Sequence, residues 1–226
     1  MPRKNLRLLN GKPLVVYPIS TAQACQLITR TIVSTDDEEI AETARRYGAE
    51  VPFKRPADLA ADDTPDLPVF QHALRWLCER EGYVPDLVVH LRATSPLREA
   101  ARVDEAIRIM LEHPDADALR SVSQAVHTPY KMWRIVDGLL KPLITLDGAA
   151  ESYNWPRQRL PEVFWHNGYV DIIRPDVILK EERMTGKHIL PFVIEHACID
   201  IDTEEDLRRA ELELTAGTVN GPKHEH

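Results

Sequence analysis

Apolar and polar residues follow two different periods along the 226 residues of this chain. Helical spacing predicts helices over residues 14–27, 38–47, 67–80, 100–111 and 204–214. Short β-branched or unbroken apolar runs predict strands over residues 31–34, 51–54, 86–91, 118–123 and 189–194. Because strands and helices follow one another in turn, the chain is predicted to form an α/β fold with a doubly wound, mostly parallel sheet. Ligands of such sheets bind beyond the carboxyl ends of the strands.

This alternation stops near residue 127. Residues 127–182 contain strand-like segments at 130–136 and 163–173 and a short helical segment at 175–182, but no long amphipathic helix. The pattern predicts an inserted, partly β lobe within an α/β core made of residues 1–126 and 183–214. Residues 215–226 lack an apolar period and are predicted to be a disordered tail.

Acidic and apolar residues alternate from Ile199 to Asp202. Since strand side chains point to opposite faces in turn, Asp200 and Asp202 are predicted to share one face. Two carboxylates repel each other unless a cation lies between them, and oxygen ligands suit Mg²⁺. An acidic pair is also common at a solvated loop edge, so the pattern alone leaves both interpretations open. Thr203, with Asp206 three residues later, resembles a capping box and predicts that a helix begins at Glu204.

Composition narrows the class of protein. The formal net charge of -8 argues against non-specific binding to nucleic acids or anionic membranes. The three cysteines, Cys25, Cys78 and Cys198, are widely spaced and fit neither a zinc motif nor a disulfide framework, which favours a reducing cytoplasm. No apolar run approaches 18 residues, and the basic first dozen residues do not form a signal peptide. A soluble cytoplasmic protein without nucleic-acid or membrane partners is expected.

Seven short motifs occur in a fixed order: Pro2-Arg3-Lys4-Asn5, Val33-Ser34-Thr35-Asp36, Arg55-Pro56-Ala57-Asp58-Leu59, Thr94-Ser95-Pro96-Leu97-Arg98, Arg157-Gln158 with Leu160-Pro161, Asn167-Gly168, and Ile199-Asp200-Ile201-Asp202-Thr203. Together they resemble the acylneuraminate cytidylyltransferases, over about residues 2–214. The resemblance implies a nucleotide-diphospho-sugar transferase-like fold. It also implies a reaction in which the anomeric hydroxyl of a 2-keto sugar acid attacks the α-phosphate of CTP, giving a CMP-sugar and pyrophosphate. It further implies Mg²⁺ as cofactor and a homodimer formed through the lobe.

The resemblance also assigns roles to individual residues. It predicts Asp200, Asp202 and Lys4 as catalytic residues, with the two aspartates as metal ligands. Arg3, Lys4, Asn5 and Arg55 are predicted to bind the nucleotide. Arg92, Ser95, Lys131, Arg157 and Asn167 are predicted to bind the sugar substrate. The basic residues among them are also typical of solvated surfaces, and Lys131 could simply lie over the ring of Trp133. His90, inside an apolar strand, is predicted to be a hydrogen-bonded core histidine.

The sequence departs from the family pattern at several places. The family normally begins with an apolar strand and a Gly-rich phosphate loop before the segment that matches Pro2 to Asn5, and the sequence shows neither. We therefore expect lower activity than for a version extended upstream. Arg92-Ala93 replaces Gln-Pro, Ile144 lies near the place of an arginine, and Tyr169-Val170-Asp171 replaces apolar and aromatic residues. These changes leave two alternatives open: another sugar acid, such as legionaminate or pseudaminate, or a pseudoenzyme or scaffold that keeps fold and dimer interface without turnover.

Overall fold

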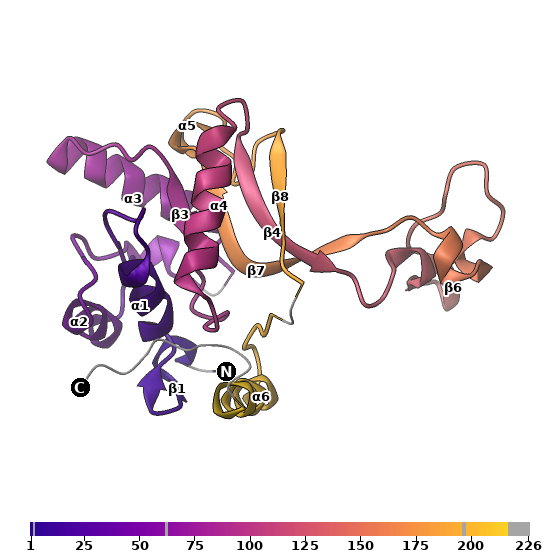
Figure 1. The fold of residues 1–226 in the computed structure, drawn as a ribbon, viewed down its shortest axis with the longest axis horizontal. Coiled ribbons are helices and arrows are strands. Elements are labelled where there is room, and N and C mark those ends of the chain that lie inside the picture. The colour runs from indigo at the N-terminus through magenta and orange to yellow at the C-terminus, as the bar shows by residue number, and fades with distance from the viewer. Residues whose placement is uncertain (2, 62, 196–197, 217–226) are drawn as a thin grey trace.

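A four-stranded sheet flanked by helices lies at the centre of the body, and an arm projects from one side of it (Figure 1). The computed structural model describes residues 1, 3–61, 63–195 and 198–216. The strand order is β3 (Val88–His90), β7 (Phe164–Ile173), β4 (Ala118–Gln124) and β8 (Ile189–Val193). β4 and β8 are parallel, whereas β7 runs antiparallel to β3 and β4. The predicted α/β class is confirmed, and the sheet is mixed because β7 returns from the arm between two strands of the opposite direction.

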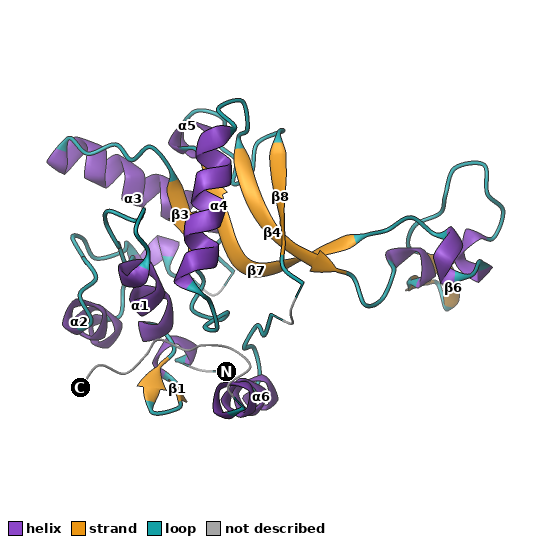
Figure 2. Cartoon of the chain, viewed as in Figure 1, coloured by secondary structure: helices purple, strands orange, loops and turns teal. Residues whose placement is uncertain are grey.

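Helices cover both faces of this sheet (Figure 2). One face carries α4 (Ala100–Glu112), and the other carries α3 (Asp66–Glu81) and α5 (Pro175–Leu179). The remaining α-helices are α1 (Val16–Ala24), which packs against α2 (Glu38–Arg46) and α4, and α6 (Glu204–Thr215), which packs against β1. Local signals explain the ends of several of them. The Asp37 carboxylate accepts hydrogen bonds from the backbone N–H groups of Glu39 and Ile40 and so begins α2, and Gly82, with φ of 63°, ends α3. Of the predicted tail, Thr215 belongs to α6 and residues 217–226 lie outside the described residues.

The strands predicted over residues 31–34 and 51–54 do not form, and one parallel bridge between Ile32 and Glu50 takes their place. Backbone hydrogen bonds from Val33 N to Glu50 O (2.9 Å) and from Glu50 N to Thr31 O (2.8 Å) support it. Pairing cannot continue through Pro52, which has no N–H to donate. A separate small ladder joins β1 (Leu8–Leu9) to β2 (Lys12–Pro13), which shapes the N-terminal segment.

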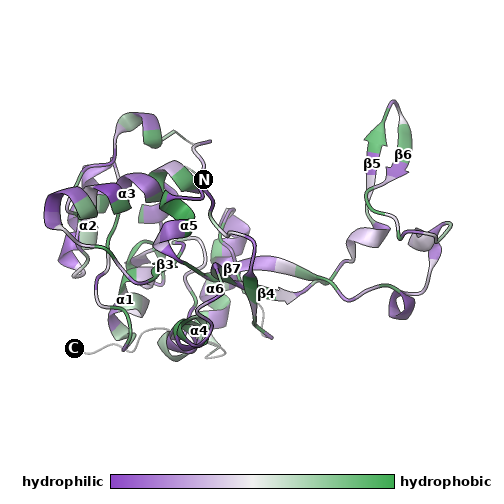
Figure 3. Cartoon of the chain, turned by 90° about the horizontal axis from the view of Figure 1, so that it is seen from above, coloured by the Kyte–Doolittle hydropathy of each residue, from purple (hydrophilic) through white to green (hydrophobic). Residues whose placement is uncertain are grey.

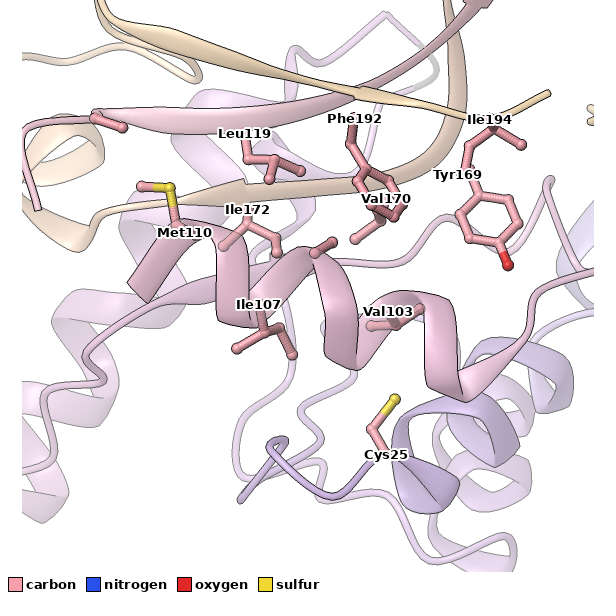
Figure 4. Close-up of a cluster of buried hydrophobic side chains, with 12 residues drawn as sticks. Cys25, Val103, Ile107, Met110, Leu119, Tyr169, Val170, Ile172, Phe192 and Ile194 are labelled. Carbon is pink, nitrogen blue, oxygen red and sulfur yellow. The ribbon is translucent and has the colours of Figure 1, made fainter. Parts of the chain in front are cut away.

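The core consists of clusters that fix the sheet and the C-terminal segment. One cluster places Ile107 and Met110 of α4 against Leu119, Ile172 and Phe192 of the sheet (Figure 4). The opposite face packs on α3 and α5 through an apolar cluster that contains Leu74, Ala118, Ile173 and Ile178. Another cluster buries Leu9, Leu14, Tyr17, Ile199, Ile201 and Leu207 together. This last cluster holds the N-terminal segment next to the acidic motif.

The arm carries β5 (Trp133–Val136) and β6 (Leu139–Pro142), an antiparallel hairpin with Asp137 and Gly138 at positive φ. Short 3₁₀ helices at Pro129–Lys131, Ser152–Asn154 and Arg157–Arg159 complete it. Much of this hairpin is coloured as hydrophobic in Figure 3. Its apolar side chains are nevertheless open to solvent: Ile135 is 76 %, Leu139 67 % and Leu140 64 % exposed. The lobe predicted over residues 127–182 contains this arm, and it also contains β7 and α5, which pack in the body. Within the described residues, no helix is long and apolar enough to cross a membrane.

Candidate active site

The acidic motif presents its carboxylates to solvent. Asp200 and Asp202 are exposed, whereas Ile199 and Ile201 are 6 % and 0 % exposed, so the predicted alternation is found in the pattern of burial. The segment is not a strand, contrary to the prediction. It is held by its buried isoleucines and by a hydrogen bond from Ile201 N to Thr94 O (2.7 Å), which brings it to the loop after β3.

The start of α6 fixes the backbone of Asp202. The predicted capping box is present: the Thr203 hydroxyl accepts from Asp206 N, and the Asp206 carboxylate accepts from Thr203 N. The same carboxylate accepts a hydrogen bond from Asp202 N (3.2 Å). Hydrogen bonds from Thr203 lower the pKa of Asp206, so this acceptor stays ionised near neutral pH.

Two contacts gather predicted residues from distant parts of the chain. Lys4 Nζ donates to Asp202 Oδ1 at 2.7 Å. Ser95 Oγ donates to Asp200 Oδ1 at 3.4 Å, the long limit of a hydrogen bond. The Lys4 side chain is 27 % exposed and that of Asp202 67 %, so this cation and this carboxylate both remain accessible to a ligand.

Arg98 holds the loop that carries Ser95. It is 3 % exposed and donates from Nε to Tyr169 O and from Nη2 to Gly168 O (3.1 Å). Burial lowers its pKa to about 10, and in the described part of the chain its Nη1 has no partner. At Gly168, with φ of +69°, a Cβ would lie 3.0 Å from the Ser95 hydroxyl, which explains the glycine. Arg98 ends the motif Thr94-Ser95-Pro96-Leu97-Arg98, but the sequence did not predict that it would be buried and hold this loop.

The predicted nucleotide-binding residues lie in three different surroundings. Arg3 is exposed and pairs with Glu39 and, at 3.7 Å, with Asp37 at the start of α2; the hydrogen bond to Glu39 raises its pKa. Asn5 is exposed, and its carbonyl accepts from the backbone N–H of residue 15 (2.9 Å). Arg55 is half-buried, which lowers its pKa, and donates to both the hydroxyl (3.1 Å) and the carbonyl of residue 34. Of these four residues, Lys4 contacts the acidic motif directly, whereas the contacts that the described part of the chain gives Arg3, Asn5 and Arg55 are with other residues.

The predicted substrate-binding residues of the body differ in accessibility. Arg92 Nη2 donates to Asp66 Oδ2 at 2.9 Å, and 30 % of its side chain is exposed. Asn167 is 1 % exposed, and both ends of its amide are used: Nδ2 donates to Ser123 Oγ (2.9 Å) and Oδ1 accepts from Tyr169 N (3.1 Å). Its amide therefore supports the turn beside Gly168 and is not open to a ligand in this structure.

Lys131 and Arg157 lie in the arm. They line an open hollow of about 450 Å³, whose lining residues are Val126, His127, Thr128, Lys131, Met132 and Arg157. Arg157 Nη2 also donates to Ala125 O (2.9 Å). The arm projects from the body and away from α6 (Figure 1). Within one chain, the structure does not bring these two basic residues to Asp200 and Asp202.

The sequence matches a known protein family and several named relatives. Residues 1–136 match the family described as Cytidylyltransferase. The chain belongs to this family. This cytidylyltransferase is 38 % identical over 212 residues to a CMP-N,N'-diacetyllegionaminic acid synthase of Legionella pneumophila, covering 91 % of this chain and 87 % of that protein. It is 27 % identical over 208 residues to an N-acylneuraminate cytidylyltransferase of Escherichia coli, covering 92 % of this chain and 47 % of that protein.

The fold is shared with solved structures of the same kind. A CMP:2-keto-3-deoxy-manno-octonic acid synthetase complexed with CTP superposes with a TM-score of 0.69 and 14 % identity, over 96 % of this chain and 93 % of that chain. The predicted resemblance and the nucleotide-diphospho-sugar transferase-like fold are confirmed. By family, the cytidylyltransferase is a nucleotidyltransferase.

The donor set of this cytidylyltransferase fits a hard cation. Asp200 and Asp202 offer only oxygens and are exposed, and Mg²⁺ retains several waters and takes one or two carboxylates with substrate phosphates. Among the described residues, no group of three or more histidine, cysteine or acidic side chains could hold a metal. The two aspartates thus suit a metal shared with a phosphate ligand, and the role stays a prediction.

His90 was predicted to be a hydrogen-bonded core histidine; it is half-buried, and its ring packs edge-on against the ring of Phe70, with the centroids 4.7 Å apart. Its Nδ1, however, has no partner in the described part of the chain. Burial, together with the nearby charge of Arg92, lowers its pKa to about 4, so the ring is neutral at pH 7. His90 therefore does not act as a cation in this site.

Proposed function

We propose that this cytidylyltransferase transfers CMP from CTP to the anomeric hydroxyl of a 2-keto sugar acid of the sialic-acid type, releasing pyrophosphate. The observation that carries the proposal is the pair of contacts that joins Lys4 to Asp202 and Ser95 to Asp200. These contacts place a cation, two exposed carboxylates and a hydroxyl at one site. Relatives named as synthases of CMP-legionaminic acid and as N-acylneuraminate cytidylyltransferases support the substrate class.

The chemistry needs little more than positioning and charge. The hydroxyl oxygen forms a bond to the α-phosphorus, the bond from phosphorus to pyrophosphate breaks, and the hydroxyl proton is released. Phosphoryl transfer of this kind depends mainly on positioning and electrostatics. In the proposal Lys4 offsets phosphate charge, and Arg3, Asn5 and Arg55 remain candidate contacts of the nucleotide. Asp200 and Asp202 would hold Mg²⁺, which supplies charge neutralisation and lowers the pKa of a bound hydroxyl.

The exposed arm supports a homodimer as part of the proposal. Its exposed large apolar side chains include Ile135, Leu139 and Leu140, and exposed apolar surface is typical of protein–protein interaction sites. Since the arm points away from its own body, Lys131 and Arg157 would reach the sugar acid only in the site of a second copy. Cys25, Cys78 and Cys198 form no disulfide, which fits a reducing cytoplasm, and the proposed localisation is cytoplasmic.

Release of pyrophosphate tests the proposal directly. The chain would be incubated with CTP, Mg²⁺ and, in separate reactions, N-acetylneuraminate, N,N'-diacetyllegionaminate, pseudaminate or 2-keto-3-deoxyoctonate. We expect release with at least one nine-carbon acid and loss of release when Mg²⁺ is chelated. A chain that binds CTP and forms the dimer, but releases no pyrophosphate with any acid, would contradict the proposal and favour a scaffold without turnover.

A further inference from the structure

A row of polar side chains crosses the sheet beside the candidate site. In the strand register, Asp171 of β7 lies opposite His90 of β3 on one side and opposite Arg120 of β4 on the other. Residues paired in this way present their side chains on the same face of a sheet. This is the face covered by α3, since Ala118 and Ile173, two positions from Arg120 and Asp171, pack against that helix. A buried acid therefore lies in the middle of a central sheet.

Asp171 is surrounded by basic groups. Its side chain is 5 % exposed, and Oδ1 accepts from Arg120 Nε at 3.0 Å and contacts His166 Nε2 at 3.1 Å. Its Oδ2 lies 3.7 Å from Arg92 Nη2. Burial raises the pKa of Asp171, but the hydrogen bond from His166 and the charge of Arg120 outweigh this and lower it. Asp171 is therefore an ionised acid that holds three basic side chains in place.

The basic groups, unlike the acid, face solvent. The side chains of Arg92, Arg120 and His166 are 30 %, 31 % and 34 % exposed. Within the described residues, Arg120 donates its side-chain hydrogen bond from Nε, and its two terminal nitrogens, Nη1 and Nη2, make none. Its two terminal nitrogens are donors that accept nothing, so the group that completes them must be an acceptor. A carboxylate matches the planar end of a guanidinium through two parallel hydrogen bonds.

The three basic side chains, Arg92, Arg120 and His166, lie next to the turn at Gly168 in β7, which also contacts the candidate active site. A Cβ at Gly168 would lie 3.8 Å from Arg92 Cδ and 3.0 Å from Ser95 Oγ. Ser95 in turn contacts Asp200. The loop after β3 thus connects Arg92, at one end of the basic groups, to Asp200 through Ser95.

We propose that Arg120, with His166 beside it, binds the carboxylate of the sugar acid, and that Asp171 positions both of them. The inference rests on the proposed function and adds to it the residues that distinguish an acid from a neutral sugar. Arg120 and His166 contact the substrate in this scheme, whereas Asp171 acts through them. A purely structural ion cluster would affect folding but would not sense the charge of the substrate.

Substrate pairs that differ only in the carboxyl group separate these roles. The probes are N-acetylneuraminate and N,N'-diacetyllegionaminate, each with its methyl ester. Kinetic constants come from pyrophosphate release, and binding comes from calorimetry with a non-hydrolysable CTP analogue. In the Arg120→Met variant we expect KM and Kd for the acid to rise roughly 10- to 100-fold, the range for a lost hydrogen bond between charged groups. The constants for the ester and for CTP should change less than threefold.

Two further variants and a matched control complete the test. Asp171→Asn should reduce the preference for the acid over the ester, and Asp171→Glu should restore part of it, which a merely structural acid would not do. Arg45→Met is the matched control, because Arg45 is an exposed arginine of α2 that pairs with Glu38 (3.0 Å) and loses the same charge. Its constants should equal those of the wild type.

Three outcomes decide the matter. If Arg120→Met loses preference for the acid while Arg45→Met keeps it, the inference is supported. If the wild type uses the acid and Arg120→Met discriminates acid from ester equally well, the inference is wrong and the proposed function stands. If the wild type neither turns over nor binds any acid, the proposed function fails, and the inference fails with it.

Discussion

Replacement of Asp202 by asparagine distinguishes a role in catalysis from a role in the stability of the fold. Asp202 pairs with Lys4 at 2.7 Å, and its side chain is 67 % exposed. Asparagine has almost the same shape and keeps an oxygen that can accept from Lys4, but it lacks the negative charge. We expect Asp202→Asn to fold normally and to lose turnover.

The two magnitudes differ enough to be measured apart. An exposed ion pair contributes about 0.2–1 kcal/mol, so the free energy of unfolding should fall by less than about 1 kcal/mol. Loss of one of two predicted metal ligands should lower kcat/KM on the order of 100-fold or more, which corresponds to about 2.7 kcal/mol of transition-state stabilisation. The change in catalysis should therefore exceed the change in stability severalfold.

Pyrophosphate release across a Mg²⁺ titration and urea denaturation provide the two measurements. Glu204→Gln is the matched control, because Glu204 is an exposed acid two residues later that pairs with Arg7. It removes the same charge from the same surface and should leave turnover within threefold of the wild type. The reasoning would be refuted if Asp202→Asn kept turnover within threefold, or if its turnover and its stability fell in equal measure.

Three other predictions concern the cap, the buried acid and the arm. Thr203→Ala removes the hydroxyl that caps α6 and should lower the free energy of unfolding in urea by about 1 kcal/mol, whereas Thr203→Ser should retain most of it. Because the folded pKa of Asp171 is lowered, its stabilising contribution is present above about pH 4 and is lost as pH falls through the folded value. Unfolding measured from pH 7 to pH 3 should show this loss, and Asp171→Asn should flatten it; an equal slope in both would contradict the assignment. Ile135→Lys with Leu139→Lys places charges on the arm and should convert a dimer to a monomer in light scattering, and a dimer that persists would show that the arm is not the interface.

Elements with strong local signals could be predicted from the sequence. The starts of α2 and α6 follow from Asp37 and from the capping box of Thr203 and Asp206, whose hydrogen bonds join residues two or three positions apart. The direction of β7 could not be predicted in this way. Its place between β3 and β4 depends on residues far away in sequence, and an apolar run is equally typical of a parallel or an antiparallel buried strand.

In the candidate site, too, features set by neighbouring residues could be predicted and contacts between distant residues could not. The alternation of Ile199 to Asp202 predicted which side chains would face solvent, because burial alternates with position even outside a strand. The contacts of Arg120 with Asp171 were missed, because they depend on the register of two strands 51 positions apart. The one local signal was Asp171 itself, a charged residue in the otherwise apolar end of β7. A lone charge inside a buried strand indicates a partner but does not identify it.

β7 connects the arm to the candidate site through a single strand. The strand begins at Phe164, at the root of the arm, and its buried end passes Gly168 and Asp171 beside the candidate site. Between these points the pairing with β4 is irregular: Phe164 to His166 pair with Val122 to Gln124, the register then shifts, and pairing resumes from Asp171 opposite Arg120. The paired segments on both sides of this irregular stretch anchor the arm and Asp171 to the same strand, β4, and a movement of the arm would reach Asp171 through the stretch that contains Gly168. Association of two chains through their arms would then set the shape of both sites at once.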